Sequence, residues 1–292
     1  MNGLLVIDKP GGITSHDVVN RLRKITGEKT IGHLGTLDPM ATGVLPLLLG
    51  KFTRLAQFFS SAEKSYSGVI RFGFATDTYD TEGELVGERT EPGFTLDDLH
   101  RAANRFHGEM QQMPPPFSAK KINGTPAYKL ARAGKDVELK PSTVCIDSFQ
   151  IVNLNGCDAS FVMTISAGGY VRSIAHQLGR DLGCGAHLAS LRRTQAGVFT
   201  LAEAHTLDEL QMIAGNIEAL EDLCMHPRSL LPAMPSVTAD EQTIGRLRNG
   251  AQANLPEFSA APMIKVFAGQ RDLFAIAIRV AGTLFQPTVV LG

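Results

Sequence analysis

The stretch from residue 32 to residue 43 reads GHLGTLDPMATG, and it is the most informative part of the chain. Asp38 stands directly before Pro39, which pushes its backbone out of the helical region into an extended or polyproline geometry. The glycines around it allow the backbone to approach a ligand closely. An acid presented on such a loop can act as a nucleophile or a general base, and the alternative is an Asp that only caps a turn.

The segments on either side of this loop predict a mixture of strands and helices. Residues 4–8 read as a short strand, and an amphipathic helix with Ser15 as its N-cap follows and ends at Gly27. The apolar run at residues 44–49 is typical of a buried strand. Further strands are expected at 66–74, 143–153, 159–166, 263–268, 273–280 and 288–291, and further helices at 52–59, 95–108, 170–183 and 238–249.

Composition excludes several classes of protein. The chain has 292 residues, of which 43% are hydrophobic and 20% charged, and its net charge is −1. These values are typical of a globular protein and exclude a disordered or collagen-like chain. No apolar run approaches the roughly 20 residues of a membrane helix, and the N-terminus lacks the features of a signal peptide. We therefore expect a cytoplasmic protein without membrane contact.

The four cysteines are scattered, without a C-x-x-C pair or a histidine at ligand spacing. This pattern argues against a zinc site and against a disulfide framework. The four are Cys145, Cys157, Cys184 and Cys224.

Arg172 falls in the first turn of a predicted helix. The helix dipole disfavours a cation there by about 0.3–1 kcal/mol, so we expect an anionic partner such as a buried carboxylate. The alternative is an arginine that extends to solvent. Tyr66 and Tyr170 open a strand and a helix, where catalytic and stacking groups often lie, although either could be a tyrosine at the edge of the core.

Three segments of this neutral chain are locally basic, namely residues 1–60, 113–140 and 166–193. The second opens with three prolines, which exclude a helix there. Together they favour one phosphate-binding surface, and scattered solvated charge is the alternative. Residues 199–224 contain acids but no Lys or Arg, so we expect a solvated helical face away from any polyanion.

Motifs spread in order from residue 8 to residue 193 resemble those of the TruB family of bacterial tRNA pseudouridine(55) synthases. The resemblance implies an α+β pseudouridine synthase fold, in which helices flank a mixed, largely antiparallel sheet over residues 1–232. It also implies a thumb-like RNA-binding insertion at 113–140 and a small β-rich PUA-like module at 236–292. The motifs are DKP (8–10), the 32–43 stretch, KSY (64–66), TDT (76–78), GYVRSI (169–174), LGCGAHL (182–188) and LRR (191–193).

The resemblance implies that uridine 55 in the T-loop of tRNA is flipped out and isomerised to pseudouridine. The N1–C1′ bond breaks, the uracil turns, and C5 rejoins C1′, so no metal and no cofactor is implied. The implied partner is tRNA, through its T-arm and T-loop. A monomer with no obligatory protein partner is expected.

The resemblance also implies roles for individual residues. Asp38 matches the family's nucleophile, and Arg172 matches the arginine that pairs with it, where an opposite charge lowers the pKa of an acid. Tyr66 matches the tyrosine that stacks on the target base and is a candidate for moving a proton at the sugar. The remaining substrate-binding candidates are Tyr170 and Leu191 in the uracil pocket, His33 against the flipped T-loop, and Lys9.

Three alternatives stay open. The first is a non-enzymatic RNA-binding or tRNA-folding protein that keeps the pocket. The second is a guide-dependent synthase for ribosomal RNA, which the lack of basic terminal extensions disfavours. The third is a carboxylate hydrolase, for which the sequence offers no second acid paired with Asp38.

Overall fold

The computed structural model describes residues 1–118, 121–122, 125–126 and 139–292. Most of the expected thumb-like insertion at 113–140 lies outside these residues. In the described part, ten strands form one sheet in the order β14-β1-β3-β12-β4-β11-β10-β7, with β2 paired to β3 and β13 to β12. Most neighbours are antiparallel, as expected. The ten strands are β1 (Gly3–Lys9), β2 (Ile31–His33), β3 (Thr42–Leu49), β4 (Lys64–Phe72), β7 (Gly108–Gln112), β10 (Ser142–Asn155), β11 (Asp158–Ile165), β12 (Ala186–Ala196), β13 (Phe199–Thr200) and β14 (Ala204–His205).

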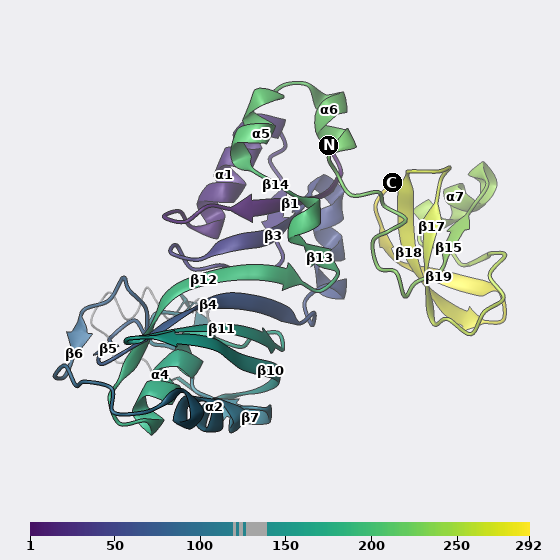
Figure 1. The fold of residues 1–292 in the computed structure, drawn as a ribbon. Coiled ribbons are helices and arrows are strands. Elements are labelled where there is room, and N and C mark those ends of the chain that lie inside the picture. Colours follow the sequence, from purple (N-terminus) through teal and green to yellow (C-terminus); the bar gives the residue numbers. More distant parts are fainter. Residues whose placement is uncertain (119–120, 123–124, 127–138) are drawn as a thin grey trace.

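Helices cover both ends of this sheet. Figure 1 shows α1 and α5 beside β1 at one end, and α2 and α4 beside β10 and β11 at the other. Two short hairpins, β5–β6 and β8–β9, stand apart from the sheet. The hairpin strands are β5 (Ala75–Thr76), β6 (Leu85–Val86), β8 (Lys121–Ile122) and β9 (Thr125–Pro126). The helices of this part of the chain are α1 (Ser15–Thr26), α2 (Leu96–Asn104), α4 (Val171–Asp181), α5 (Leu207–Met212) and α6 (Ile217–Asp222), with 3-10 helices η1 (Gly50–Phe58) and η2 (Leu201–Glu203).

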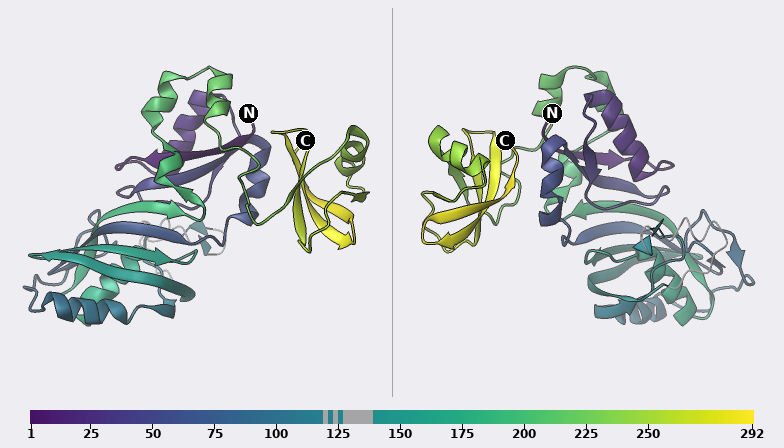
Figure 2. Two further views of the ribbon diagram at one scale, coloured as in Figure 1. Left: turned by 45° about the vertical axis from the view of Figure 1, so that its right-hand side comes forward. Right: turned by 180° about the vertical axis from the view of Figure 1, so that it is seen from behind.

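A second, five-stranded sheet is built from the C-terminal residues. Its strand order is β15-β17-β18-β19-β16, and it lies at the far end of the molecule from α4 (Figure 2). Besides the three expected strands it contains the short β15 and β16, and its helix begins at Glu241 rather than at residue 238. The elements are β15 (Ser236–Thr238), α7 (Glu241–Arg248), β16 (Ala253–Asn254), β17 (Met263–Phe267), β18 (Leu273–Ala281) and β19 (Leu284–Val290).

The apolar run of β1 is buried on both faces of the large sheet. Leu5 and Ile7 belong to the core that also contains α1, whereas Leu4 and Val6 belong to a second core with η1. Continuous apolar runs are typical of strands covered on both sides. Phe267 of the small sheet joins that second core. The two sheets therefore share buried surface, and the division at residues 232–236 stays a prediction.

The helix α1 begins one residue earlier than the sequence pattern indicates. Thr14 is the N-cap, because its Oγ1 accepts from Asp17 N–H at 3.0 Å while Asp17 Oδ2 accepts from Thr14 N–H at 2.9 Å. This reciprocal capping box satisfies two free backbone donors. Ser15, expected to be the cap, is buried and bonds to the loop that carries Asp38.

Two further segments show how the structure refines the sequence pattern. The sequence at 30–43 is rich in Gly, Pro and Thr and predicts a loop, but it contains the strand β2, whose residues Ile31–His33 pair with Leu47–Leu49 of β3. Leu47–Leu49 of β3 pair with β1 along one edge, which leaves their other edge free to pair with β2. The residues at helical spacing near Phe52 form a helix, as expected, and it is the 3-10 helix η1.

Candidate active site

Asp38 lies in the loop between β2 and β3, and the start of α1 holds that loop. Ser15 Oγ accepts from Leu37 N–H at 2.8 Å and donates to Leu37 O at 3.1 Å. Ala41 N–H donates to Asp38 O at 3.1 Å, which closes the turn around Pro39. Leu37 and Ala41 are buried. The polar backbone of the loop is thus satisfied in an apolar setting, as burial requires.

Lys9 also helps to hold the Asp38 loop in place. Its fully buried side chain places Nζ within reach of three carbonyls, Pro10 O at 2.8 Å, Ile13 O at 2.6 Å and Pro39 O at 3.2 Å. Burial lowers the pKa of Lys9 to about 8, and Asp38 opposes this shift. Gly12 N–H also donates to Pro39 O, at 2.9 Å. Lys9 therefore ties the turn after β1 to the Asp38 loop.

Arg172 has the carboxylate partner that its place in the first turn of α4 predicts. Nη2 donates to Asp38 Oδ1 at 2.8 Å and to Phe117 O at 3.1 Å. Nη1 donates to Thr78 O at 3.0 Å and lies 3.3 Å from Asp80 Oδ2. Both Arg172 and Asp80 are buried. The expected pairing of Asp38 with Arg172 is confirmed, and Asp80 is an additional partner that the sequence pattern did not indicate.

The electrostatic balance around Asp38 differs from a simple ion pair. Burial raises the pKa of Asp38, and the Asp80 carboxylate raises it further, whereas Arg172 and Lys9 lower it. Asp38 and Asp80 share the Arg172 guanidinium, so its positive charge only partly compensates the negative charge of each carboxylate. Desolvation disfavours the charged form of a buried acid. The net pKa shift is upward, opposite to what pairing with an arginine alone predicts.

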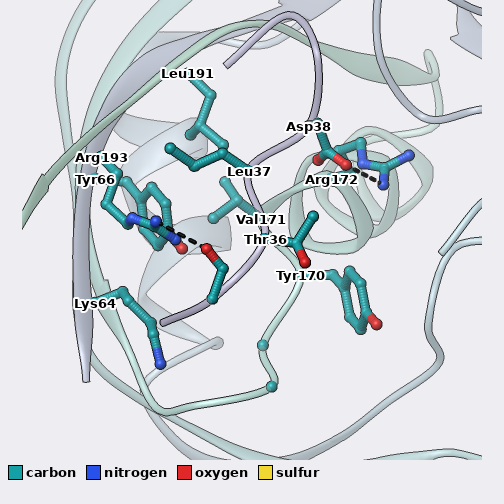
Figure 3. Close-up of a pocket in the computed structure, with 13 residues that line it drawn as sticks. Thr36, Leu37, Asp38, Lys64, Tyr66, Tyr170, Val171, Arg172, Leu191 and Arg193 are labelled. Atoms are coloured by element: carbon teal, nitrogen blue, oxygen red, sulfur yellow. Dashed lines mark hydrogen bonds and ion pairs between the residues drawn. The ribbon is translucent and has the colours of Figure 1, made fainter. Parts of the chain in front are cut away.

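A cavity of about 230 Å³ opens beside Asp38. Figure 3 shows Asp38 and Arg172 at one end and Tyr66, Arg193 and Lys64 at the other. Pockets for drug-sized ligands are larger, about 300–1,000 Å³, so this cavity suits a group no larger than one base. The lining residues are Gly35, Thr36, Leu37, Asp38, Lys64, Tyr66, Gly168, Gly169, Tyr170, Val171, Arg172, Leu191 and Arg193.

Tyr66 and Arg193 are direct neighbours across β4 and β12. Arg193 is only 1% exposed, and it donates from Nε to Val44 O at 2.7 Å and from Nη2 to Gly35 O at 3.0 Å. Burial raises the pKa of Tyr66, while the nearby Arg193 guanidinium opposes this. Tyr66 is therefore a neutral phenol at neutral pH.

Arg193 was not among the predicted site residues, although the sequence contained a signal for it. Side chains two residues apart share one face of a strand. Leu191 and Arg193 are paired without a bulge between them, opposite Gly68 and Tyr66. Once Leu191 is assigned to the pocket, Arg193 must face the same way.

Of the seven predicted site residues, five line the cavity together: Asp38, Tyr66, Tyr170, Arg172 and Leu191. Tyr170 is held through its backbone, because its N–H donates to Gln112 Oε1 at 2.8 Å and its carbonyl accepts from Gln112 Nε2 at 3.0 Å. His33 and Lys9 do not line the cavity.

His33 lies on β2 with its Nδ1 buried and without a hydrogen-bond partner among the described residues. Burial and the charge of Arg193 lower the pKa of His33, so its ring is neutral at neutral pH.

Within the described ranges, no group of three His, Cys, Asp or Glu side chains could hold a metal ion. The cysteines, all in described segments, are free. In that same part of the chain, no helix has the length and apolar character needed to cross a membrane.

Sequence comparisons match this chain to one family over most of its length. Residues 23–171 match the profile of the TruB family pseudouridylate synthase N-terminal domain, and residues 172–232 match the tRNA pseudouridylate synthase B C-terminal domain. The tRNA pseudouridine synthase B of Solibacter usitatus is 46% identical over 294 residues, which cover 100% of both chains. The protein of that name from Aquifex aeolicus is 39% identical, covering 91% of this chain and 92% of its own.

Solved structures resemble the whole chain in fold. A Cbf5-Nop10-Gar1 complex contains a chain with a TM-score of 0.71 and 24% identity, covering 99% of this chain and 85% of that chain. A chain of an H/ACA RNP bound to a substrate RNA containing 2′-deoxyuridine has a TM-score of 0.70 and 23% identity, with 99% and 85% coverage. Together with the profile matches, they confirm the expected α+β pseudouridine synthase fold. The five-stranded sheet at the C-terminal end is the expected small β-rich module.

Proposed function

The chain belongs to the TruB family of pseudouridylate synthases, and we propose that it isomerises uridine 55 in the T-loop of tRNA, with Asp38 as the nucleophile. The named relatives support the coarser statement that it forms pseudouridine in tRNA. The position of the target uridine and the role of Asp38 are our proposals.

One arrangement carries the proposal. A carboxylate lies at the edge of a base-sized cavity, 2.8 Å from a buried guanidinium, with the Tyr66 side chain in the same cavity. A flipped base could enter this space beside Tyr66, which would bring its sugar toward Asp38. Aspartate carboxylates are established nucleophiles in glycosyl chemistry.

The proposed reaction is balanced within the substrate. Asp38 acts at the sugar, either by adding to C1′ or by promoting a glycal, and the N1–C1′ electron pair leaves with the uracil. The uracil turns in the cavity, and C5 bonds to C1′. The proton lost from C5 is matched by the proton gained at N1, so nothing is consumed.

We assign the other predicted residues by where they lie. Tyr66 stacks on the base, and as a neutral phenol it can donate a proton or hydrogen bond at the sugar. Tyr170 and Leu191 form the walls that exclude water from the uracil. His33 lies outside the cavity and would contact the flipped loop. Lys9 Nζ already serves three carbonyls, so we assign it a positioning role under Asp38 in place of the predicted substrate contact.

The proposed partner is a folded tRNA, bound by a monomer without an obligatory protein partner. The target base lies inside a structured loop, so it must be extruded at a cost of a few kcal/mol. Stacking on an aromatic ring returns about 1–3 kcal/mol per base. Proteins usually recognise structured RNA by its shape, its phosphates and its flipped-out bases.

The position of the target is tested by mapping. Purified protein is incubated with an unmodified tRNA transcript, and pseudouridine is located by carbodiimide modification and primer extension. We predict one new pseudouridine, at position 55, and none in a matched transcript that carries cytidine there. Pseudouridine elsewhere, or in both transcripts, would contradict the assignment.

A further inference from the structure

A turn at residues 76–80 packs against α4 and supplies two of the four polar contacts that Arg172 makes with described residues. Arg172 Nη1 donates to Thr78 O at 3.0 Å and lies 3.3 Å from Asp80 Oδ2. Thr78 Oγ1 in turn donates to Asp80 Oδ1 at 2.6 Å. Two residues that flank Tyr79 therefore meet at one nitrogen of the guanidinium.

The backbone of Tyr79 makes this convergence possible. Its φ is +65°, in the left-handed region that bulky residues rarely adopt. Its N–H donates to Thr76 O at 3.2 Å, and its carbonyl accepts from Leu188 N–H at 2.9 Å. Such conformations persist only where surrounding contacts over-determine them. The chain reversal at Tyr79 turns both neighbours toward Arg172.

A ring stack holds Tyr79 in place from the side of α4. The rings of Tyr79 and His176 lie 3.8 Å apart between centroids, with an interplanar angle of 17°. His176 follows Arg172 by four residues, so both side chains project from the same face of the helix, one turn apart. Burial and the charge of Arg180 lower the pKa of His176, which leaves its ring neutral beside these arginines. The helix thus contacts the turn at two adjacent points.

The orientation of the Arg172 guanidinium depends on its contacts with this turn. Its Nε is buried and has no hydrogen-bond partner among the described residues. Nη2 contacts Asp38 and Phe117 O. The contacts of Nη1 with Thr78 O and Asp80 both come from the turn at Tyr79. If the turn relaxes, Nη1 loses both of these contacts, and the guanidinium is free to rotate relative to Asp38.

We propose that Tyr79 and His176 are positioning residues for catalysis, whose stack sets the angle at which Arg172 presents Nη2 to Asp38. This inference rests on the proposed function of the Asp38 site. Neither residue lines the cavity, so neither is a catalytic residue. They act through Thr78 O and Asp80, which are the contacts between the turn and Arg172.

The test compares variants that remove the stack with one that keeps it. Tyr79→Ala and His176→Ala lose the ring contact, whereas Tyr79→Phe keeps the ring and loses only the hydroxyl. Small misplacements of catalytic groups cost up to about 100-fold in rate. We therefore expect the single-turnover rate at saturating enzyme to fall about 10- to 100-fold in both Ala variants. The Kd for tRNA stays unchanged, and Tyr79→Phe reacts at the rate of the unaltered protein.

A double-mutant cycle then tests whether the effect passes through Arg172. In an Arg172→Lys background, Tyr79→Ala is expected to cause little further loss of rate, because residues that act through one group are not additive. Phe94→Leu is the matched control. Its ring packs edge-on against Phe72, with centroids 4.9 Å apart. Phe94→Leu should lower the melting temperature of the protein and leave the single-turnover rate unchanged.

Each outcome decides the inference. Unchanged single-turnover rates in both Ala variants would overturn the inference. A loss of rate that adds fully to the loss caused by Arg172→Lys would also overturn it, and so would an equal loss in Tyr79→Phe. Circular dichroism and tRNA binding separate these results from a failure to fold, and Tyr79→Phe keeps the test valid if the Ala variants unfold. Failure of the proposed function is distinguishable, because the unaltered protein would then form no pseudouridine or Asp38→Asn would still form it.

Discussion

The guanidinium of Arg172 contacts two carboxylates at once, with Nη2 2.8 Å from Asp38 Oδ1 and Nη1 3.3 Å from Asp80 Oδ2. The side chain of Asp38 is 31% exposed, whereas that of Asp80 is 3% exposed. Asp38 is therefore the carboxylate that a substrate can reach, and Asp80 remains inside as a second anion. Arg172 holds the Asp38 carboxylate in place, while burial and the Asp80 charge raise the pKa of Asp38.

Replacing Arg172 with methionine should destabilise the fold as well as the site. Removing one member of a buried ion pair leaves an uncompensated charge and costs about 3–5 kcal/mol. We expect a fall of about 3 kcal/mol in the free energy of unfolding, measured by urea denaturation. Arg180→Met changes an exposed arginine on the same helix and should alter it by less than about 0.5 kcal/mol. Equal effects of the two changes would contradict this interpretation.

The raised pKa of Asp38 predicts a visible acid limb in the pH–rate profile. In the proposed mechanism the ionised Asp38 carboxylate is the reactive form, so the single-turnover rate should rise with pH through a value above the ordinary carboxyl pKa of about 3.9. Asp80→Asn removes a like charge, which lowers the pKa of Asp38. The limb should therefore move to lower pH in this variant. A limb that stays in place or moves upward would count against the sharing of Arg172 between two carboxylates.

Tyr66→Phe separates stacking from proton transfer. The substitution keeps the ring and removes a hydroxyl whose pKa burial has raised. Acid–base groups contribute about 10²–10⁴-fold, so we expect at least a roughly 100-fold lower single-turnover rate with unchanged tRNA binding. Tyr66→Leu removes the ring too and should also weaken binding. If Tyr66→Phe reacted at the rate of the unaltered protein, the ring alone would account for the role of Tyr66.

Gly43→Ala should disrupt the contact between β3 and β12. The φ of Gly43 is +99°, and a Cβ there would lie 2.2 Å from the Arg193 carbonyl oxygen. We expect a loss of roughly 3 kcal/mol or more in stability, from backbone strain together with a clash. Gly12→Ala is the matched control, because Gly12 has a φ of +81° and a Cβ there would meet nothing within 4 Å. Equal losses would show that strain alone matters.

Sequence patterns predicted the elements whose hydrophobic periodicity is local. The strands β1, β3, β4, β10 and β11 and the helices α2 and α4 lie where the spacing of apolar residues indicates. The anionic partner of Arg172 was also expected, because the helix dipole disfavours a cation in the first turn of a helix. These inferences used only neighbours in the chain.

Features that depend on distant partners were missed. The strand β12 carries LRRTQ, which lacks an apolar alternation, and it becomes a central strand because β3 and β4 pair with its two edges. Asp80 lies in a turn of polar sequence, and it is buried because it pairs with Leu188 of β12 and contacts Arg172 of α4. Arg193 is buried because carbonyls of two separate segments, at Val44 and Gly35, accept its hydrogen bonds.

We propose that Asp38 is the nucleophile of a tRNA pseudouridine 55 synthase. This proposal is tested most directly with an unmodified tRNA transcript that carries tritium at C5 of its uridines, because formation of the new C5–C1′ bond releases that tritium to water. We predict release equivalent to one uridine per tRNA from the unaltered protein and none from Asp38→Asn, which should still bind the transcript. Release that persists in Asp38→Asn, or no release from the unaltered protein despite bound tRNA, would contradict the claim.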